Sequence, residues 1–210
     1  MRASLVQSVV VVGLLAGCAG GYSIKPAEVL DERTGVTVGA LQEPIELVEE
    51  ARNAAPTYTA APIYTAAPSN TAAPINGERR TSFAYLGPVE WDKSGDISYG
   101  LWVHIAPGSD RQFGDIRSSG ALTLILDDGP LVLRPLNDAN AVGGPYKPAS
   151  SWGQTGYFAL DVATLKRLSA SNKLVLDFRY AGGSSMEFTP SHETRATLKK
   201  FMQARGITDD

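Results

Sequence analysis

The second half of the chain contains several short stretches in which apolar and polar residues alternate, a pattern that predicts β-strands. Between residues 99 and 105 the odd-numbered positions are aromatic or aliphatic, whereas Trp102 and His104 belong to the opposite face. Residues 121–126 and 131–133 are mainly apolar and flank the turn sequence Asp-Asp-Gly-Pro, so they predict a hairpin. Residues 174–180 alternate in the same way and lead through a Gly-Gly turn to another strand.

Two helices are predicted among these strands. Asp161 can cap a short helix that runs through Leu165 and Leu168. Ser191 can cap a longer C-terminal helix that Gly206 ends. Short strands separated by regular turn signals favour a mainly β fold. We therefore expect an antiparallel β-sandwich or barrel-like domain with a short helix and a C-terminal helix.

Residues 54–76 form an internal repeat with a period of six, in which Ala-Ala-Pro recurs. A proline in every repeat removes backbone donors and biases the preceding alanine toward extended geometry. Repeats of this period also occur in β-helices. A β-helix, however, would not have a proline in every coil and would need more bulky apolar residues than this repeat contains. The repeat therefore predicts an extended spacer.

The segment before the repeat allows two interpretations. Residues 36–38 favour a strand, whereas residues 44–52 fit either a short helix that begins at Pro44 or a strand with Ile45 and Leu47 on one face. If these residues are strands, they join the C-terminal sheet and the repeat is an expanded loop. Otherwise they belong to a tether. We slightly favour strands, because a bare tether has no need of these apolar residues.

The N-terminus combines a short positive start with an apolar run, residues 9–16, that is followed by Cys18. This order is typical of a signal peptide. A membrane-spanning helix needs about 20 apolar residues, and the stretch from Ala3 to Ala19 is shorter and interrupted by polar residues. A cleaved signal with an incidental cysteine is the other alternative.

The tetrapeptide Leu15-Ala16-Gly17-Cys18 resembles the lipobox of bacterial lipoproteins. The resemblance implies that Cys18 becomes the first residue of the mature protein and carries acyl chains that attach it to a membrane. Ala19 replaces the aspartate that retains such proteins in the inner membrane, so the resemblance implies an outer-membrane, periplasm-facing location. Segments that begin at Thr34, Ile45 and Tyr99 loosely resemble small proteobacterial lipoproteins with no assigned activity.

These features divide the chain into four parts. Residues 1–17 are the signal peptide, and residues 18–53 are a tether with possible N-terminal strands. Residues 54–78 are the repeat, and residues 79–210 are the β-rich domain, which ends in a helix.

Charge and cysteine content narrow the possible partners. Removing Arg2 with the signal leaves 18 basic and 22 acidic residues, a net charge of −4 without a basic patch, which disfavours nucleic acid. Cys18 is the only cysteine, so the fold contains no intramolecular disulfide. The domain must therefore be stable through its hydrophobic core.

Candidate chemistry is sparse in this sequence. His104 and His192 lack metal-ligand spacing, and Asp127-Asp128 suits a turn, so we expect no metal, cofactor or enzymatic activity. Aromatic side chains in loops and on strand faces can contact sugars or proteins, which makes Trp102, His104 and Trp152 candidate ligand-binding residues. The expected function is a non-enzymatic, lipid-anchored envelope protein that binds a partner. A glycan-binding module is the alternative, and a hydrolase is a remote one.

Overall fold

The computed structural model describes residues 25–32, 34–50, 82–106, 114–136, 144–179 and 185–208. The predicted signal peptide, Cys18 and the repeat lie outside the described residues. The described part is mainly antiparallel β-sheet with two helices, the second of which is C-terminal, so the predicted fold class is confirmed. Its elements are β1 (Pro26–Asp31), β2 (Val36–Leu41), β3 (Ile45–Glu49), β4 (Phe83–Lys93), β5 (Asp96–Ala106), β6 (Leu122–Leu126), β7 (Gly129–Val132), β8 (Gln154–Leu160), α1 (Val162–Ala170), β9 (Leu174–Arg179), β10 (Ser185–Pro190) and α2 (Arg195–Ala204).

A long hairpin of β4 and β5 forms the centre of the sheet, and each strand has 11 residues. Its turn places Ser94 and Gly95 at positive φ, the conformation that two-residue hairpins favour. The other edge of β4 is divided between two strands, because β3 pairs with residues 83–86 and β2 with residues 89–92. All three strands that precede the repeat, β1, β2 and β3, therefore belong to the same sheet as the C-terminal strands.

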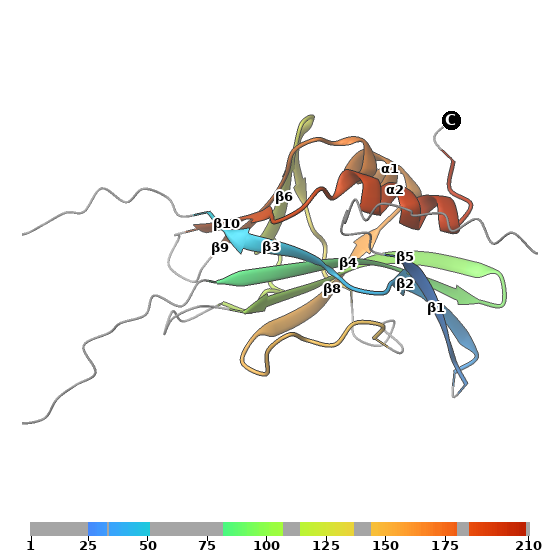
Figure 1. Ribbon diagram of the computed structural model, residues 1–210. Coiled ribbons are helices and arrows are strands. Elements are labelled where there is room, and N and C mark those ends of the chain that lie inside the picture. Colours follow the sequence, from blue (N-terminus) through green and yellow to red (C-terminus); the bar gives the residue numbers. More distant parts are fainter. Residues whose placement is uncertain are drawn as a thin grey trace, which may run out of the picture.

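The rest of the sheet extends from both sides of this hairpin. Beyond β3 follow β10, β9, β6 and β7, while β8 pairs with β5 on the opposite side. The open sheet coils so that its ends approach each other (Figure 1). There, Pro135 forms an isolated bridge with Phe158, and Leu136 N donates to Tyr157 O at 2.8 Å. The sheet thus has the sandwich-like form that its turn spacing predicted.

The two faces of the central strands are covered by different parts of the chain (Figure 1). The helices lie on one side, where α2 buries Leu198, Phe201 and Met202. Residues 144–153 cross the other side, over the middle of β4 and β5. Because burial of apolar side chains drives folding, both layers contribute to the stability of the domain. The largest fully buried side chains are Trp102, Phe158, Phe178, Phe188 and Phe201.

The two helix starts differ from each other. Asp161 caps α1 as predicted, because its carboxylate accepts a hydrogen bond from Thr164 N at 2.7 Å. The prediction that Ser191 caps the C-terminal helix is wrong, since α2 begins at Arg195 after Thr194. Ser191 N instead donates to Glu46 O at 3.1 Å and ties the chain to β3. Gly206 follows α2 at φ +67°, as expected of a helix terminator.

Neither helix in the described part of the chain is long and apolar enough to cross a membrane.

Candidate binding surface around Trp152

Trp102 and His104, two of the predicted binding residues, are enclosed in the structure. They lie on the face of β5 that residues 144–153 cover, and their exposed fractions are 1% and 0%. Their rings stack at a centroid distance of 5.9 Å. Neither side chain is therefore accessible to a ligand in this structure.

Tyr146 fastens the covering segment to the sheet. Its hydroxyl accepts a hydrogen bond from Leu41 N at 2.9 Å and donates one to Pro88 O at 3.0 Å. Leu41 and Pro88 would form the next pair after Ala40 and Val89 in the β2–β4 ladder. The hydroxyl thus bridges backbone groups at the point where β4 changes its partner from β2 to β3. Because unpaired backbone groups are costly to bury, this bridge stabilises the junction.

The aromatic part of Tyr146 contributes a second set of contacts. Its ring packs against Trp102 at a centroid distance of 5.1 Å. It also lies directly over Gly87, where any side chain would collide with it. Burial raises the pKa of the Tyr146 hydroxyl well above its usual range, so the group stays protonated and can donate to Pro88 O.

His104 fastens the segment at a second point. Its Nε2 lies 3.1 Å from Ser150 Oγ, and its Nδ1 lies 2.9 Å from Thr155 Oγ1. Burial lowers the pKa of the imidazole, which favours the neutral ring. A neutral ring donates a hydrogen bond to one of these two hydroxyls and accepts one from the other. Gly153 lies against the ring so closely that a Cβ atom there would be 2.4 Å from His104 Cε1.

Trp152 belongs to the same covering segment, and its side chain is exposed to solvent. Its exposed fraction is 65%, the highest among the large hydrophobic side chains of the described residues. The half-buried Phe83 and Tyr85 belong to the same face of the sheet, and the Tyr85 ring is 6.2 Å from His104. We call Trp152, Phe83 and Tyr85 the aromatic surface.

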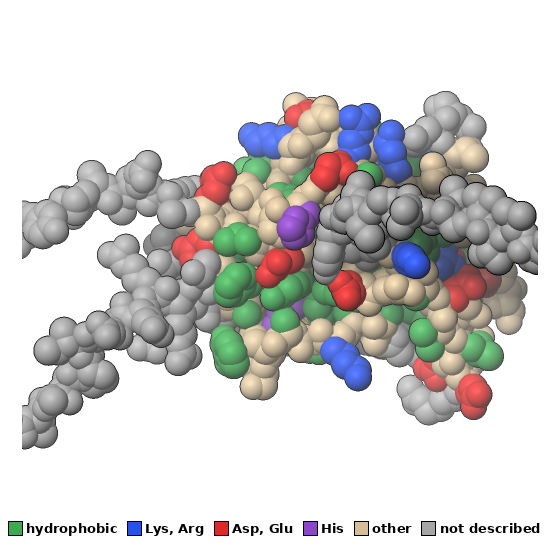
Figure 2. All heavy atoms as spheres, in the orientation of Figure 1, with side chains coloured by type: hydrophobic (Ala, Val, Ile, Leu, Met, Phe, Trp, Pro, Cys, Tyr) green, Lys and Arg blue, Asp and Glu red, His purple; other side chains and the backbone are tan. Residues whose placement is uncertain are grey.

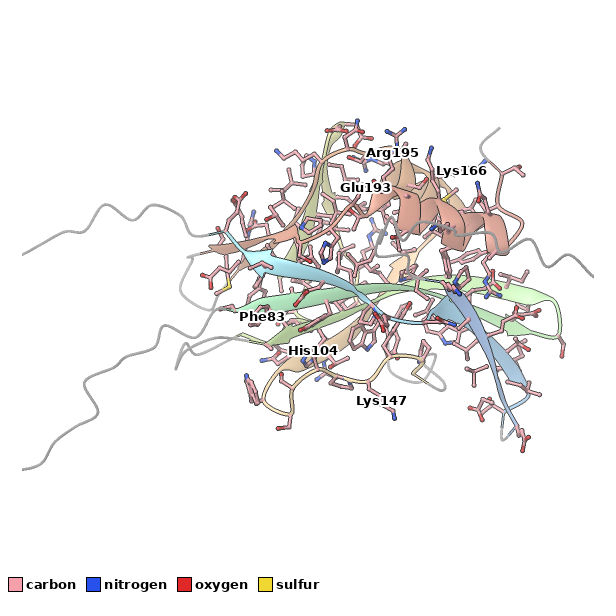
Figure 3. The ribbon with its side chains drawn as sticks, in the orientation of Figure 1. Phe83, His104, Lys147, Lys166, Glu193 and Arg195 are labelled. Atoms are coloured by element: carbon pink, nitrogen blue, oxygen red, sulfur yellow. The ribbon has the colours of Figure 1, made fainter. Side chains whose placement is uncertain are left out.

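The charges around the aromatic surface are few and of both signs. Glu46 pairs with Tyr85 across the strands, and burial together with this carboxylate raises the pKa of the Tyr85 hydroxyl. Lys147 projects from the covering segment on the same side of the sheet as His104 (Figure 3). The surface is therefore mainly aromatic rather than strongly charged.

The histidine and the paired aspartates considered as candidate chemistry make structural contacts. No group of three or more metal-ligating side chains occurs among the described residues. His104 faces two hydroxyls, whereas a catalytic triad would supply a carboxylate to orient the ring. Asp127 and Asp128 occupy a hairpin turn, where Asp127 accepts from Asn172 N and Asp128 pairs with Arg167. These two aspartates hold the β6–β7 turn against the end of α1.

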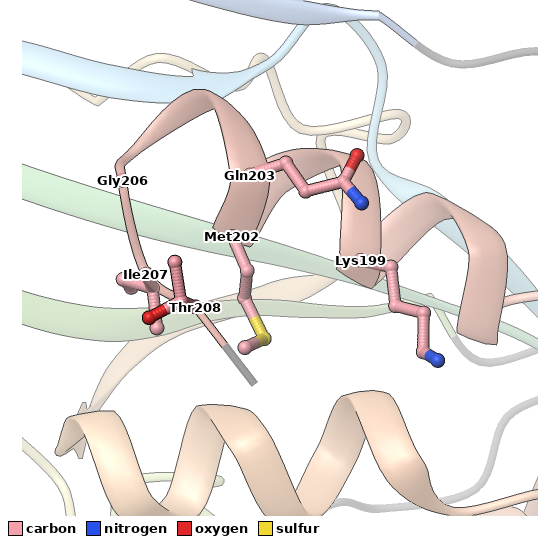
Figure 4. Close-up of a pocket in the computed structure, with 6 residues that line it drawn as sticks. All are labelled: Lys199, Met202, Gln203, Gly206, Ile207 and Thr208. Carbon is pink, nitrogen blue, oxygen red and sulfur yellow. The ribbon is translucent and has the colours of Figure 1, made fainter. Parts of the chain in front are cut away.

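A hollow of about 330 Å³ lies at the end of α2, on the helical side of the sheet (Figure 4). Lys199 and Gln203 are its long polar side chains, and Met202 and Ile207 supply apolar contacts. These residues do not form a recognisable catalytic or metal-binding set. The hollow is separate from the aromatic surface, which lies on the opposite face.

Sequence reasoning did not identify two groups that organise the structure. One is Tyr146, an aromatic residue of a Gly/Pro-rich loop, whose role in fastening that loop to the sheet was not predicted. The other is Arg205, which lies between Glu28 and Glu90. Nothing in the local sequence distinguishes either residue, because each contacts strands more than 50 residues away.

The comparisons with known proteins add no relative. No protein-family model matches the chain, and neither the curated proteins nor the solved structures contain a significant match.

Proposed function

We propose that this chain is a lipid-anchored cell-envelope protein with a non-enzymatic, partner-binding role. The sequence Leu15-Ala16-Gly17-Cys18 supports the anchor, because it resembles a lipobox behind an apolar signal-like run. The compact β domain supports a binding role, because its described polar clusters serve to fasten segments together. The membrane contact in this proposal is made through acyl chains on Cys18, with the domain facing the periplasm from the outer membrane.

The aromatic surface is the proposed contact with the partner. The observation that carries this part is Trp152, an exposed indole on a segment that Tyr146 and His104 hold on the sheet. Exposed aromatic side chains on rigid supports are typical of residues that dominate binding energy. Phe83 and Tyr85 are further half-buried aromatic side chains on the face of the sheet that this segment covers.

A glycan is the second candidate partner, because sugar rings stack on exposed indole faces in the same way as apolar protein groups pack on them. Trp152 is exposed enough to present such a face. Peptidoglycan or a surface polysaccharide would be the glycan, given the proposed location.

Fractionation of cells that carry Cys18→Ala tests the anchor. We expect the wild-type protein to sediment with membranes and the variant to appear in the soluble periplasmic fraction. Membrane association of the variant would contradict the proposed anchor. Cys18→Ser serves as a second variant that also prevents acylation.

Two binding assays test the aromatic surface. Affinity capture from envelope extracts and sedimentation with purified cell wall are each performed with wild type, Trp152→Ala and Trp152→Phe. Val132→Ala is the matched control, because Val132 is 54% exposed on β7. We expect Trp152→Ala to lose at least tenfold of the binding, Trp152→Phe to retain part of it and the control to match wild type. Equal binding by Trp152→Ala and wild type in both assays would remove the aromatic surface as the contact.

A further inference from the structure

The tether between the proposed anchor and the folded domain is short. β1 begins at Pro26, eight residues after Cys18. Eight fully extended residues span at most about 29 Å. The repeat does not lengthen this tether, because it lies between β3 and β4 within the order of the sheet. A domain anchored at Cys18 is therefore held close to the membrane.

Contacts at β1 fix the end of that tether. The strand pairs with β2 along all six of its residues. Arg205, at the end of α2, donates to the Glu28 carboxylate and to Ala27 O. Its guanidinium also lies over Gly39, which pairs with Glu28 in the β1–β2 ladder. β1 is thus held by the sheet and by the C-terminal helix, so it does not act as additional tether.

The adjacent ends of the β1–β2 and β4–β5 hairpins carry exposed aliphatic side chains. Val29 and Leu30 are each 58% exposed, and Ile97 is 50% exposed at the start of β5. Leu30 and Ile97 share one face, because Leu30 pairs with Thr37, Thr37 with Asp92 and Asp92 with Ile97. Hydrophobic side chains gather here beside acidic ones, at the end formed by the β1–β2 and β4–β5 hairpins (Figure 2). Val29 precedes Leu30 in the strand and faces the other side of the sheet, so we call only Leu30 and Ile97 the hairpin-tip patch.

We infer that the hairpin-tip patch rests on the bilayer that holds the acyl chains of Cys18; this inference depends on the proposed anchor. Leu30 lies four residues beyond Pro26, about 13 Å along the strand. The tether, which spans up to about 29 Å, is long enough for this far end of β1 to turn toward the bilayer. Exposed aliphatic side chains gain free energy when they enter the apolar part of a membrane interface.

The charges near the patch define the kind of lipid surface. By sequence, the two hairpin tips carry three acidic residues, Asp31, Glu32 and Asp96, against two basic ones, Arg33 and Lys93. An anionic surface would repel this acidic end. The patch thus fits a zwitterionic surface, such as one of phosphatidylethanolamine and phosphatidylcholine.

The test uses the mature chain coupled through the Cys18 thiol to a maleimide lipid in zwitterionic nanodiscs that also contain a gadolinium headgroup lipid. Methyl NMR signals report the distance of each side chain from the surface through paramagnetic broadening. We expect the signals of Leu30 and Ile97 to broaden at least fivefold more than that of Val132, which is similarly exposed on β7. A double variant with Leu30→Ser and Ile97→Ser should lose this preference.

Three outcomes would overturn the inference. Stronger broadening at Val132 would place another face on the bilayer, and uniform broadening would show no preferred orientation. Loss of the patch signals with rising protein concentration and without lipid would mean that the patch pairs two copies of the chain. Because the coupling is chemical, failure here leaves the proposed anchor intact, whereas the fractionation of Cys18→Ala tests the anchor alone.

Discussion

The ring of Tyr146 lies so close to Gly87 that a Cβ atom at position 87 would be 2.2 Å from Tyr146 Cε2. This approach brings the tyrosine hydroxyl to Leu41 N and Pro88 O, where the two strands that share an edge of β4 meet. The glycine therefore permits the contact that fastens the covering segment to the sheet. Pro88 has no N–H group to donate to the ladder, and the hydroxyl bridges the two backbone groups of this pair that remain, Leu41 N and Pro88 O.

Gly87→Ala should destabilise the domain by about 2 kcal/mol, because the added methyl group displaces the Tyr146 ring from a well-packed site. Denaturant unfolding followed by tryptophan fluorescence measures the change. Gly156→Ala is the matched control, because its nearest neighbours are side-chain atoms at 3.2 Å or more. We expect the control to be less destabilised than Gly87→Ala, because its neighbours are side-chain atoms that need to move only a few tenths of an ångström. Equal effects of the two substitutions would contradict the role assigned to Gly87.

Tyr146→Phe isolates the contribution of the hydroxyl. The ring remains in place, but the Leu41 N–H group and the Pro88 carbonyl lose a partner in a buried environment. We expect a loss of about 1–3 kcal/mol in the free energy of unfolding. Hydrogen exchange supplies a local measurement, in which the Leu41 amide should lose protection more than amides in β9. Unchanged protection at Leu41 would show that water replaces the hydroxyl without cost.

The parts of the fold that could be predicted from the sequence are those that short-range chemistry determines. The turn at Asp127 and Asp128 and the Asp161 cap depend on neighbours within a few residues. Ser191 was mispredicted because its hydrogen-bond partner is Glu46, which lies 145 residues away. The division of one edge of β4 between β2 and β3 is equally non-local.

Prediction of the candidate site from the sequence was limited in the same way, because its decisive contacts are also long-range. Alternation correctly placed Trp102 and His104 on one face of β5, because strand side chains alternate between faces. What covers that face depends on Tyr146, whose partner in β2 is 105 residues away. Sequence reasoning could therefore group the aromatic residues but could not distinguish the buried Trp102 from the exposed Trp152.

Acidification should destabilise the domain through His104. Burial lowers the pKa of the folded-state imidazole below its ordinary value near 6.5. The unfolded chain therefore binds more protons as the pH falls through that value, and stability decreases by up to about 1.4 kcal/mol per pH unit. His104→Gln removes this titration and retains a donor and an acceptor. We expect its stability to fall less than that of wild type between pH 7 and pH 5, as measured by urea unfolding, and parallel curves for the two proteins would exclude His104 as the source.

Arg205 should contribute more to the free energy of unfolding than an exposed arginine in an ion pair does. Its side chain is only 6% exposed, it contacts Glu28, and its Nη1 lies 3.6 Å from Glu90 Oε1. Burial raises the pKa of Glu90, while Arg205 and a hydrogen bond with Tyr99 favour the charged form. Arg205→Ala leaves this buried carboxylate without its cation, so we expect a loss of about 3 kcal/mol.

Arg117→Ala provides the comparison for Arg205, because Arg117 and its partner Asp115 are about half exposed. Such surface pairs contribute about 0–1 kcal/mol. Adding Glu90→Gln to Arg205→Ala should recover part of the lost stability, since the unpaired charge is removed. In Arg205→Ala, the amides of β1 and β2 should lose protection from hydrogen exchange, because Arg205 joins β1 to α2 through Glu28 and Ala27. If Arg205→Ala and Arg117→Ala cost the same, Arg205 does not hold the β1–β2 hairpin on the domain.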